Sequence, residues 1–316
     1  MIFPADTAHR IEYRLVVLLV LLVVFLEFTL RHFEDTLSGN INHIFNIPHL
    51  VTQFDDRKAD YGLIFMGNSL SNNALDIPYV EQAINSAHSG QTKVLKITPD
   101  ATSISDWYCL YHNTLEPMKN PPDTLVIGFA WAQLADQHPV EARRLGGFFC
   151  GLNNIPDLSD TELHQHQKWL EFLAGKISHV YVNRERIRNR ILSTVIPHYK
   201  EVTQSLNQTE EARDSSGPET KQWYSYHLLK KLDLQLKRHG TRLVLMAMPV
   251  INPYQVDQRL IETANNLDIS ILDLRNAPGI SRDLYKDPIH LNEAGRKIFS
   301  KLLIDDIAPE IRTKTL

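Results

Sequence analysis

The sequence has little cysteine and no marked excess of charge of either sign. Only two cysteines, Cys109 and Cys150, occur among 316 residues, too few for a disulfide framework or for a zinc site built from thiolates alone. We expect both to be unpaired thiols, with a disulfide between them as the alternative if the domain lies outside the cytosol. A formal net charge of −4 and the lack of a recognisable binding motif argue against a nucleic-acid partner.

Metal-ligand spacings are also missing from the sequence. His112 and His138 have no nearby Cys, Asp or Glu at a suitable spacing, and His164 and His166 are two residues apart, which separates them on a helix. We therefore expect no metal and no cofactor. No internal repeat is present, and the polar stretch 205–220, which contains Gly and Pro, is expected to be a mobile loop.

One long apolar run stands near the N-terminus. Residues 15–26 carry no polar side chain, and the segment from Ile11 to Leu30 has the length of about 20 residues that a spanning helix needs. No small-x-small cleavage site follows Leu30, which favours a retained anchor over a cleaved signal peptide. A buried core helix is disfavoured because the run is apolar on all sides. We predict a cytoplasmic tail and transmembrane anchor over 1–31, with membrane contact through 15–30.

The orientation of this anchor is predicted from its flanking arginines. Arg10 and Arg14 precede the apolar run and Arg31 follows it. The positive-inside rule therefore leans toward a cytoplasmic N-terminus. The rest of the chain would then lie on the periplasmic or outer side.

Short apolar runs alternate with helical patterns along the rest of the chain. Such alternation predicts an α/β fold with a parallel sheet that helices cover on both faces. The expected strands cover 62–67, 93–97, 124–129, 241–248 and 269–274, and the expected helices 76–88, 103–117, 221–238, 255–267 and 293–304. Residues 32–60 are predicted to be a connector with some helical character.

The predicted domain covers 61–316 and contains an insertion. The interval 131–220 between the third and fourth strands is too long for a simple crossover. Helical patterns over 161–173 and 179–197 predict that the insertion is helical.

Three residues in this framework suggest nucleophilic catalysis. Ser69 directly follows the first strand, and functional groups of α/β folds collect at the carboxyl ends of strands. A serine nucleophile needs a base and an acceptor that orients the base. Asp287 and His290 are three residues apart before the last helix, so the carboxylate can reach the imidazole. We predict Ser69 as nucleophile, His290 as base and Asp287 as its partner.

These blocks resemble a known superfamily. The segment Gly67-Asn68-Ser69-Leu70 after a first strand, with Asp287-x-x-His290 before a last helix, is similar to the SGNH (GDSL-like) hydrolases. The resemblance covers about residues 60–305. It implies a three-layer SGNH-like fold, with a parallel sheet of about five strands between helices.

The middle blocks depart from the superfamily. Its members place a glycine after the second strand and an asparagine after the third, both of which donate hydrogen bonds to the oxyanion. Here 98–102 contain no glycine and 128–133 no asparagine. Besides the backbone N–H of Ser69, we expect oxyanion or substrate contacts from Asn68, from backbone groups near Ala101 or Thr102, and from Trp131.

The chain is further similar to the membrane-anchored SGNH-like proteins of bacterial envelopes. That resemblance implies a single-pass protein of the bacterial inner (cell) membrane with its catalytic domain on the periplasmic or extracellular side. It implies an esterase or O-acyltransferase acting on acyl, chiefly acetyl, esters of an envelope polysaccharide. A membrane-bound O-acyltransferase is the expected partner. The alternative function is a catalytically weak accessory protein that binds glycan or works with such an acyltransferase.

Two further groups of residues have open interpretations. Aromatic residues after the second and third strands are suited either to stacking on sugar rings or to ordinary packing; they are Trp107, Tyr108, Tyr111 and Trp131. The basic run 183–190 is expected to be a solvated helix face. Contact with an anionic polymer or with lipid headgroups is the alternative.

Overall fold

Five parallel strands form one sheet in the order β2-β1-β3-β4-β5. The computed structural model describes residues 5–87, 90–199 and 224–311. The strands are β1 (Tyr61–Met66), β2 (Thr92–Ile97), β3 (Thr124–Phe129), β4 (Arg242–Ala247) and β5 (Ser270–Asp273). Each predicted strand is found within one residue at either end, so the predicted parallel α/β sheet is confirmed.

The central strands are the most apolar because both of their faces are covered. All side chains of β1 and β3 are buried, as a parallel sheet with helices on both faces requires. β1 pairs with β2 on one side, where Tyr61 lies opposite Thr92, and with β3 on the other, where Leu63 lies opposite Thr124.

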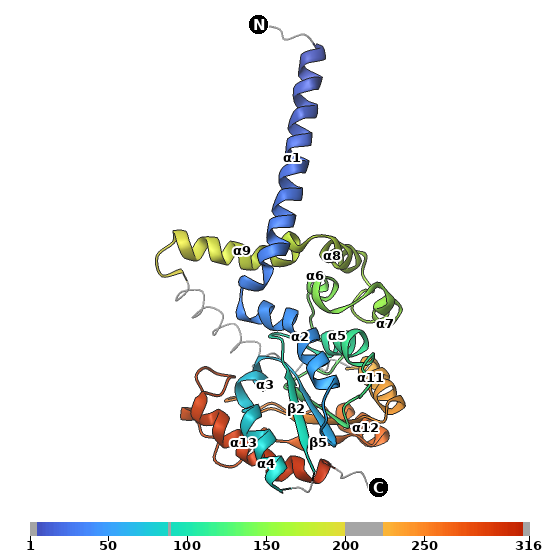
Figure 1. Cartoon of the computed structure of the whole chain (residues 1–316), viewed down its shortest axis with the longest axis vertical. Coiled ribbons are helices and arrows are strands. Elements are labelled where there is room, and N and C mark those ends of the chain that lie inside the picture. Colours follow the sequence, from blue (N-terminus) through green and yellow to red (C-terminus); the bar gives the residue numbers. More distant parts are fainter. Residues whose placement is uncertain (1–4, 88–89, 200–223, 312–316) are drawn as a thin grey trace.

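Helices pack on both faces of the sheet and form two cores (Figure 1). One face is covered by α2 (Gly39–Asp55), α5 (Ile104–Leu110), α11 (His227–Arg238) and α12 (Gln258–Leu267). The other is covered by α3 (Ser69–Ala74), α4 (Ile77–Ala87) and α13 (Glu293–Ile307). The predicted arrangement of helices on both sides of the sheet is therefore confirmed.

Residues of the predicted connector contribute to the first of these cores. Helix α2 begins after Ser38, whose hydroxyl accepts a hydrogen bond from the Ile41 N–H at 3.2 Å, a common N-cap arrangement. Its apolar stripe is buried and consists of Ile41, Ile44, Ile47, Val51 and Phe54. This segment is thus part of the α/β body.

The insertion after β3 is helical in the residues that the structure describes. It contains α6 (Ala142–Arg144), the π-helical turn η3 (Leu145–Phe149), α7 (Ile155–Leu158), α8 (His166–Ile177) and α9 (His179–Val195). Helix α6 and the turn η3 pack against α8. The loop predicted over 205–220 lies outside the described residues.

The two cysteines form a disulfide, Cys109–Cys150, with Cα atoms 4.9 Å apart. The expectation of unpaired thiols is therefore wrong. Cys109 lies on α5 and Cys150 ends the turn η3 of the insertion. Packing between α5 and η3 brings these residues together across 41 positions of sequence, which no local pattern around either cysteine encodes.

Helix α1 (Ala5–Phe33) extends away from the α/β body (Figure 1). Within the described residues it is the one helix long and apolar enough to cross a membrane, over Glu12–Thr36. The side chains of 15–26 are exposed, apart from contacts near the end that joins the domain. An apolar surface of this size needs a cover other than water.

A buried carboxyl group connects the insertion to α5. Glu162 is 9% exposed, and the hydroxyl of Ser105 on α5 donates to its Oε1 at 2.8 Å. Burial raises the pKa of Glu162 to about 7, the hydrogen bond from Ser105 opposes this, and the nearby Asp106 adds to it. The folded protein therefore holds a proton that the unfolded chain, with an ordinary glutamate, releases above pH 4.5.

This proton makes stability fall as the pH rises from 4.5 to about 7. Ionised Glu162 costs roughly 3 kcal/mol above that window, from about 1.4 kcal/mol per pKa unit. We expect Glu162→Gln to raise the melting temperature at pH 8 and to leave it nearly unchanged at pH 5, measured by thermal unfolding. The exposed Glu262→Gln on α12 is the control. Equal shifts at both pH values would contradict this reading.

Candidate active site

Ser69 lies at the point where the sheet changes its direction of winding. In the order β2-β1-β3-β4-β5, β2 is on one side of β1 and β3 on the other. Connections from β1 and β3 therefore leave toward opposite edges, and a crevice opens between them at the carboxyl ends of the strands. Ser69 comes three residues after the last residue of β1, Met66, and thus faces this crevice.

The residues before Ser69 allow a tight turn from strand to helix. A Cβ on Gly67 would lie 2.3 Å from the Ser71 hydroxyl, so only glycine lets α3 fold back this closely. Asn68 caps α3, because its Oδ1 accepts from the Leu70 N–H at 3.0 Å. Ser69 is then the first residue of the helix, where backbone N–H groups have no intrahelical acceptor.

The three predicted triad side chains form one hydrogen-bonded chain. His290 Nε2 is 2.8 Å from Ser69 Oγ, across 221 residues of sequence. On the other side of the ring, Nδ1 is 2.9 Å from Asp287 Oδ2 and 3.0 Å from Oδ1. A carboxylate only accepts hydrogen bonds, so Nδ1 carries the proton and Nε2 is left to accept the serine hydroxyl.

Asp287 is held as an anion. Its Oδ1 accepts from the N–H groups of Ile289 at 3.0 Å and His290 at 2.8 Å. Burial opposes ionisation, but hydrogen bonds from the His290 ring and from these two N–H groups outweigh it and lower the pKa of Asp287. A charged Asp287 is the state that orients the imidazole and stabilises its cation.

The segment bearing Asp287 and His290 is fixed to the start of α13. Asn292 caps this helix by accepting from the Gly295 N–H at 2.9 Å, and the Asn292 N–H donates to the Leu284 carbonyl at 2.8 Å. The Lys286 N–H also donates to the His290 carbonyl at 2.9 Å. These bonds close the turn that presents the imidazole to Ser69.

The side chains of Asn68 and Thr102 connect two loops beside Ser69. The Asn68 amide donates to the Thr102 carbonyl at 3.1 Å. The Thr102 hydroxyl donates to the carbonyls of Gly67 at 3.0 Å and Pro99 at 2.8 Å. Both buried side chains therefore join the loop after β1 to the loop after β2.

The loop after β2 carries two further candidate donors, which are backbone groups. Ala101 has a φ of 52°, a left-handed conformation that costs a residue with a Cβ about 1–2 kcal/mol. The N–H groups of Ala101 and Thr102 have no hydrogen-bond partner among the described residues. Strained backbone next to a nucleophile is a frequent feature of functional sites.

Trp131 follows β3 and is the fourth expected contact residue. Its φ is 47°, its ring packs against Tyr254 with centroids 5.5 Å apart, and its indole N–H is buried without a partner in the described part of the chain. A buried N–H normally has an acceptor, so the Trp131 indole keeps an unsatisfied donor among the described residues.

The other aromatic residues of these loops are packing residues. Trp107, Tyr108 and Tyr111 are each at most 1% exposed, which leaves no ring face for a sugar. The Trp107 indole donates to Thr102 Oγ1 at 3.0 Å and to the Gly67 carbonyl at 3.2 Å. It thereby strengthens the same connection between the loops after β1 and β2.

Arg144 is a site residue that the sequence did not reveal. It is buried in the insertion, and its guanidinium donates to the carbonyls of Ala101, at 2.6 Å, and of Asp100. An arginine can hold two carbonyls at once because its donors form a rigid fork. Arg144 thus fixes the strained loop from 43 residues away, and no local signal marks this long-range contact.

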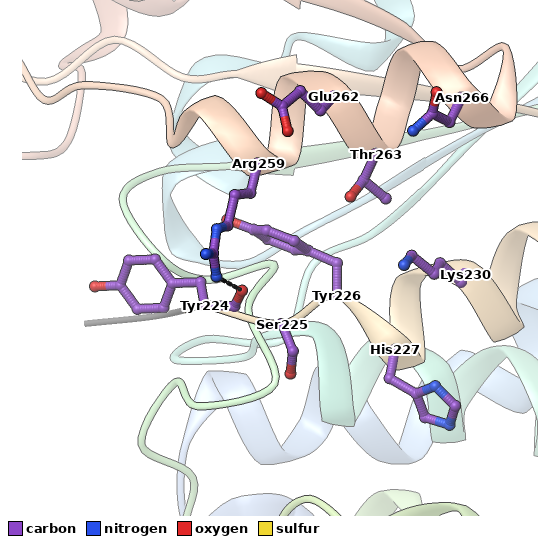
Figure 2. A pocket seen from close by; sticks show the side chains of 9 residues that line it. All are labelled: Tyr224, Ser225, Tyr226, His227, Lys230, Arg259, Glu262, Thr263 and Asn266. Carbon is purple, nitrogen blue, oxygen red and sulfur yellow. Dashed lines mark hydrogen bonds between the residues drawn. The ribbon is translucent and has the colours of Figure 1, made fainter. Parts of the chain in front are cut away.

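A separate pocket of about 470 Å³ lies at the start of α11 and beside α12 (Figure 2). It is lined by Tyr224, Ser225, Tyr226, His227, Lys230, Arg259, Glu262, Thr263 and Asn266. None of the triad residues lines it. Asp136 already accepts from the first N–H groups of α11, those of His227 and Leu228, so that helix start offers no open anion site.

Across the described ranges, no cluster of three or more His, Cys, Asp or Glu side chains is placed to hold a metal ion. The site consists of protein groups from the loops after β1, β2 and β3 and from the turn before α13.

Comparison with known proteins adds neighbours of low similarity. No family model matches the sequence, and no curated protein matches it. Similar solved structures include protein YxiM of Bacillus subtilis, with 11% identity, a TM-score of 0.40, and coverage of 80% of this chain and 58% of that one. The chain thus spans little more than half the length of that protein.

Two further solved structures are similar. One is AlinE4, an SGNH-hydrolase family esterase, with 10% identity, a TM-score of 0.31, and coverage of 80% of this chain and 97% of that one. The other is a gut microbial diltiazem-metabolizing enzyme, with 12% identity, a TM-score of 0.32, and coverage of 78% and 46%.

The Arg144 contact yields a prediction about the reactivity of Ser69. Arg144→Lys keeps the charge but cannot hold both carbonyls, so the loop bearing Ala101 is expected to relax. Since losing one oxyanion donor costs about 10²–10³ in rate, we expect a fluorophosphonate to label Ser69 about 10–100-fold more slowly. The label is measured by mass spectrometry of the intact protein.

The neighbouring Arg143→Lys is the control, because Arg143 pairs with Glu141 at 3.1 Å and does not contact the loop. Equal labelling rates in the two variants would show that Arg144 does not position the site.

Proposed function

We propose that this chain is a serine-dependent ester-processing enzyme, an esterase or an O-acyltransferase. The observation that carries the proposal is the continuous hydrogen-bonded chain from Ser69 through His290 to Asp287. A serine, a histidine with an unprotonated Nε2 and a half-buried carboxylate in this order are the groups that nucleophilic acyl transfer needs.

In the proposed first half-reaction, Ser69 Oγ attacks the acyl carbonyl and its proton moves to His290 Nε2. Negative charge then develops on the carbonyl oxygen. The N–H of Ser69, at the start of α3, and those of Ala101 or Thr102 are the donors for this oxyanion. When the intermediate collapses, His290 returns the proton to the leaving oxygen and the acyl group stays on Ser69.

In the second half-reaction, the acceptor attacks the acyl-serine and gives its proton to His290, which returns a proton to Ser69 Oγ as the bond between Oγ and the acyl group breaks. Water as acceptor gives hydrolysis, and a sugar hydroxyl gives transfer. We infer acyl esters, chiefly acetyl esters, of an envelope polysaccharide as the substrate class, with a membrane-bound O-acyltransferase as partner. The resemblance of the two end blocks to envelope SGNH-like proteins and the exposed apolar helix α1 support this inference.

Ser69→Ala is the direct test of the nucleophile. Removing the hydroxyl abolishes the acyl-serine, so we expect p-nitrophenyl acetate turnover to fall by at least about 10³-fold and fluorophosphonate labelling to disappear. The control is Ser86→Ala, an exposed serine on α4 whose hydroxyl bonds only its own helix at Gln82. Undiminished turnover in the Ser69 variant would overturn the assignment.

A second candidate function is a glycan-binding or accessory role with weak catalysis. Two observations favour it. The side chains of Asn68 and Thr102 form hydrogen bonds between loops. After the third strand, where the superfamily places an asparagine, this chain has the indole of Trp131 and no asparagine over 128–133. In this case the purified protein binds envelope glycan, hydrolyses no ester and leaves Ser69 unlabelled by the phosphonate.

We further propose that α1 anchors the chain in a bacterial inner membrane, with the α/β domain on the periplasmic or outer side. Helix α1 has the length and composition of one span. The disulfide Cys109–Cys150 supports this side, because structural disulfides persist in oxidising compartments and are rare in the cytosol.

The location can be tested by thiol chemistry in intact cells. We expect a membrane-impermeant maleimide to label Leu234→Cys, an exposed position on α11, once the outer membrane is permeabilised. The native cysteines should react only after reduction and denaturation, and reduction should lower stability by about 2–4 kcal/mol. Labelling of Leu234→Cys only after cell lysis would place the domain in the cytosol.

A further inference from the structure

The base of α1 is bonded to the start of α9. The carboxylate of Glu27 accepts from the N–H groups of His179, at 2.5 Å, and Val180, at 3.2 Å, and from the Ser178 hydroxyl at 2.9 Å. These are groups at the helix N-terminus, where N–H donors lack partners and a negative charge is stabilising. Glu27 therefore acts as a cap of a helix that begins 152 residues further along the chain.

More bonds hold the two helices in one arrangement. Glu34 is 1% exposed and contacts the His179 ring and the Asn183 amide. The Arg31 guanidinium donates to the Ile177 carbonyl at 2.9 Å, at the end of α8. At the far part of α9, Arg190 donates to the Thr36 carbonyl at 3.1 Å. Helix α9 thus lies across the base of α1 (Figure 1).

The length of α1 sets the depth of this junction. Ile11 to Leu30 covers about 30 Å at 1.5 Å per residue, the thickness of the hydrocarbon core. Glu27 lies one helical turn before Arg31, so its carboxylate and the start of α9 lie at the boundary between acyl chains and headgroups. A helix that crosses α1 at this level runs along the membrane surface.

The exposed face of α9 has the composition that such a position requires. Arg184, Arg188, Ile191 and Val195 follow one another at steps of three or four residues and so share one face. All four are exposed, with Ile191 at 57% and Val195 at 71%. We call these four residues the α9 stripe.

The α9 stripe faces away from the α/β body. The opposite face of the helix is turned toward the domain, because Val182 and Asn183 are buried and the Arg186 guanidinium lies over the Phe148 ring of the insertion. The stripe contains two arginines, Arg184 and Arg188, and both pair with Glu185 between them. Two arginines and one glutamate leave a net charge of +1. The stripe is therefore an apolar surface with a small positive charge that faces away from the insertion.

We propose that α9 is an interfacial helix whose stripe binds the surface of an anionic phospholipid bilayer. Ile191 and Val195 enter the headgroup region and Arg184 and Arg188 face lipid phosphates, as is typical of amphipathic helices that lie on membranes. This inference rests on the proposed anchoring through α1 and is independent of the catalytic proposal. Together with α1, it fixes the orientation of the active site relative to the membrane.

Single cysteines with a fluorescent label test the proposal in the full-length chain, since both native cysteines are in a disulfide. We place an NBD label at Val195→Cys, with Leu234→Cys on α11 as the exposed, membrane-distal control and Val20→Cys in the apolar run of α1 as the anchoring control. The chains are reconstituted in nanodiscs of phosphatidylcholine alone or mixed with phosphatidylglycerol. Nitroxides sit either near the headgroup or deep in the acyl chains.

An interfacial helix buries its apolar face about 5–10 Å below the headgroups. We therefore expect blue-shifted emission at position 195 that shallow nitroxides quench more strongly than deep ones, and water-exposed, unquenched emission at position 234. Position 20 should be quenched by the deep nitroxide. In the phosphatidylglycerol mixture, Arg184→Glu with Arg188→Glu should reduce quenching at 195, whereas in phosphatidylcholine alone the reduction should be smaller.

The possible failures are distinguishable. If position 20 is quenched but position 195 is not, α1 spans the bilayer and the interfacial role of α9 is wrong. If position 20 is not quenched either, the anchoring itself fails. If position 195 is protected only in native membranes and exposed in lipid nanodiscs, a membrane protein rather than lipid covers the stripe, which also overturns the proposal.

Discussion

Strand β1 has both faces buried and neighbours on both sides, and the position of every other functional group follows from this. Because β2 lies on one side of β1 and β3 on the other, the residues after Met66 lie at the crevice at the carboxyl ends of the strands. The absence of a side chain at Gly67 lets α3 turn back over that edge. The Ser69 side chain thereby faces the turn before α13. Its backbone N–H stays at the start of α3, where it has no intrahelical acceptor.

The parts of this arrangement that were predictable are those with a local signal. Each strand is a short apolar run between turn residues, and each was placed within one residue. The contact of Ser69 with His290 spans 221 residues, yet both ends sit in short blocks next to a strand and a helix. Parallel topology then requires the two blocks to meet at the same edge, so their proximity could be anticipated while their catalytic role stays a prediction.

The parts that were not predictable depend on packing between distant segments. The Cys109–Cys150 disulfide requires η3 of the insertion to pack on α5. The hydrogen bond from the Asn68 amide to the Thr102 carbonyl requires the loops after β1 and β2 to be in contact. Arg144 looks like any arginine of a helical insertion, although its two acceptors are 43 and 44 residues away. The residue type alone does not distinguish a buried arginine that bonds two backbone carbonyls from an arginine that is exposed to solvent.

The insertion also joins the end of α1 to the candidate active site through direct contacts. Glu34 contacts His179 and Asn183 at the start of α9, and Arg186 of the same helix lies over Phe148. Phe148 packs against Phe149, over whose ring the guanidinium of Arg144 lies, and Arg144 holds the carbonyl of Ala101. Well-packed side chains resist displacement, so the loop with the proposed oxyanion donors has a defined orientation relative to α1. An enzyme whose substrate is a polymer at the membrane needs this orientation, whereas one acting on a freely diffusing ester does not.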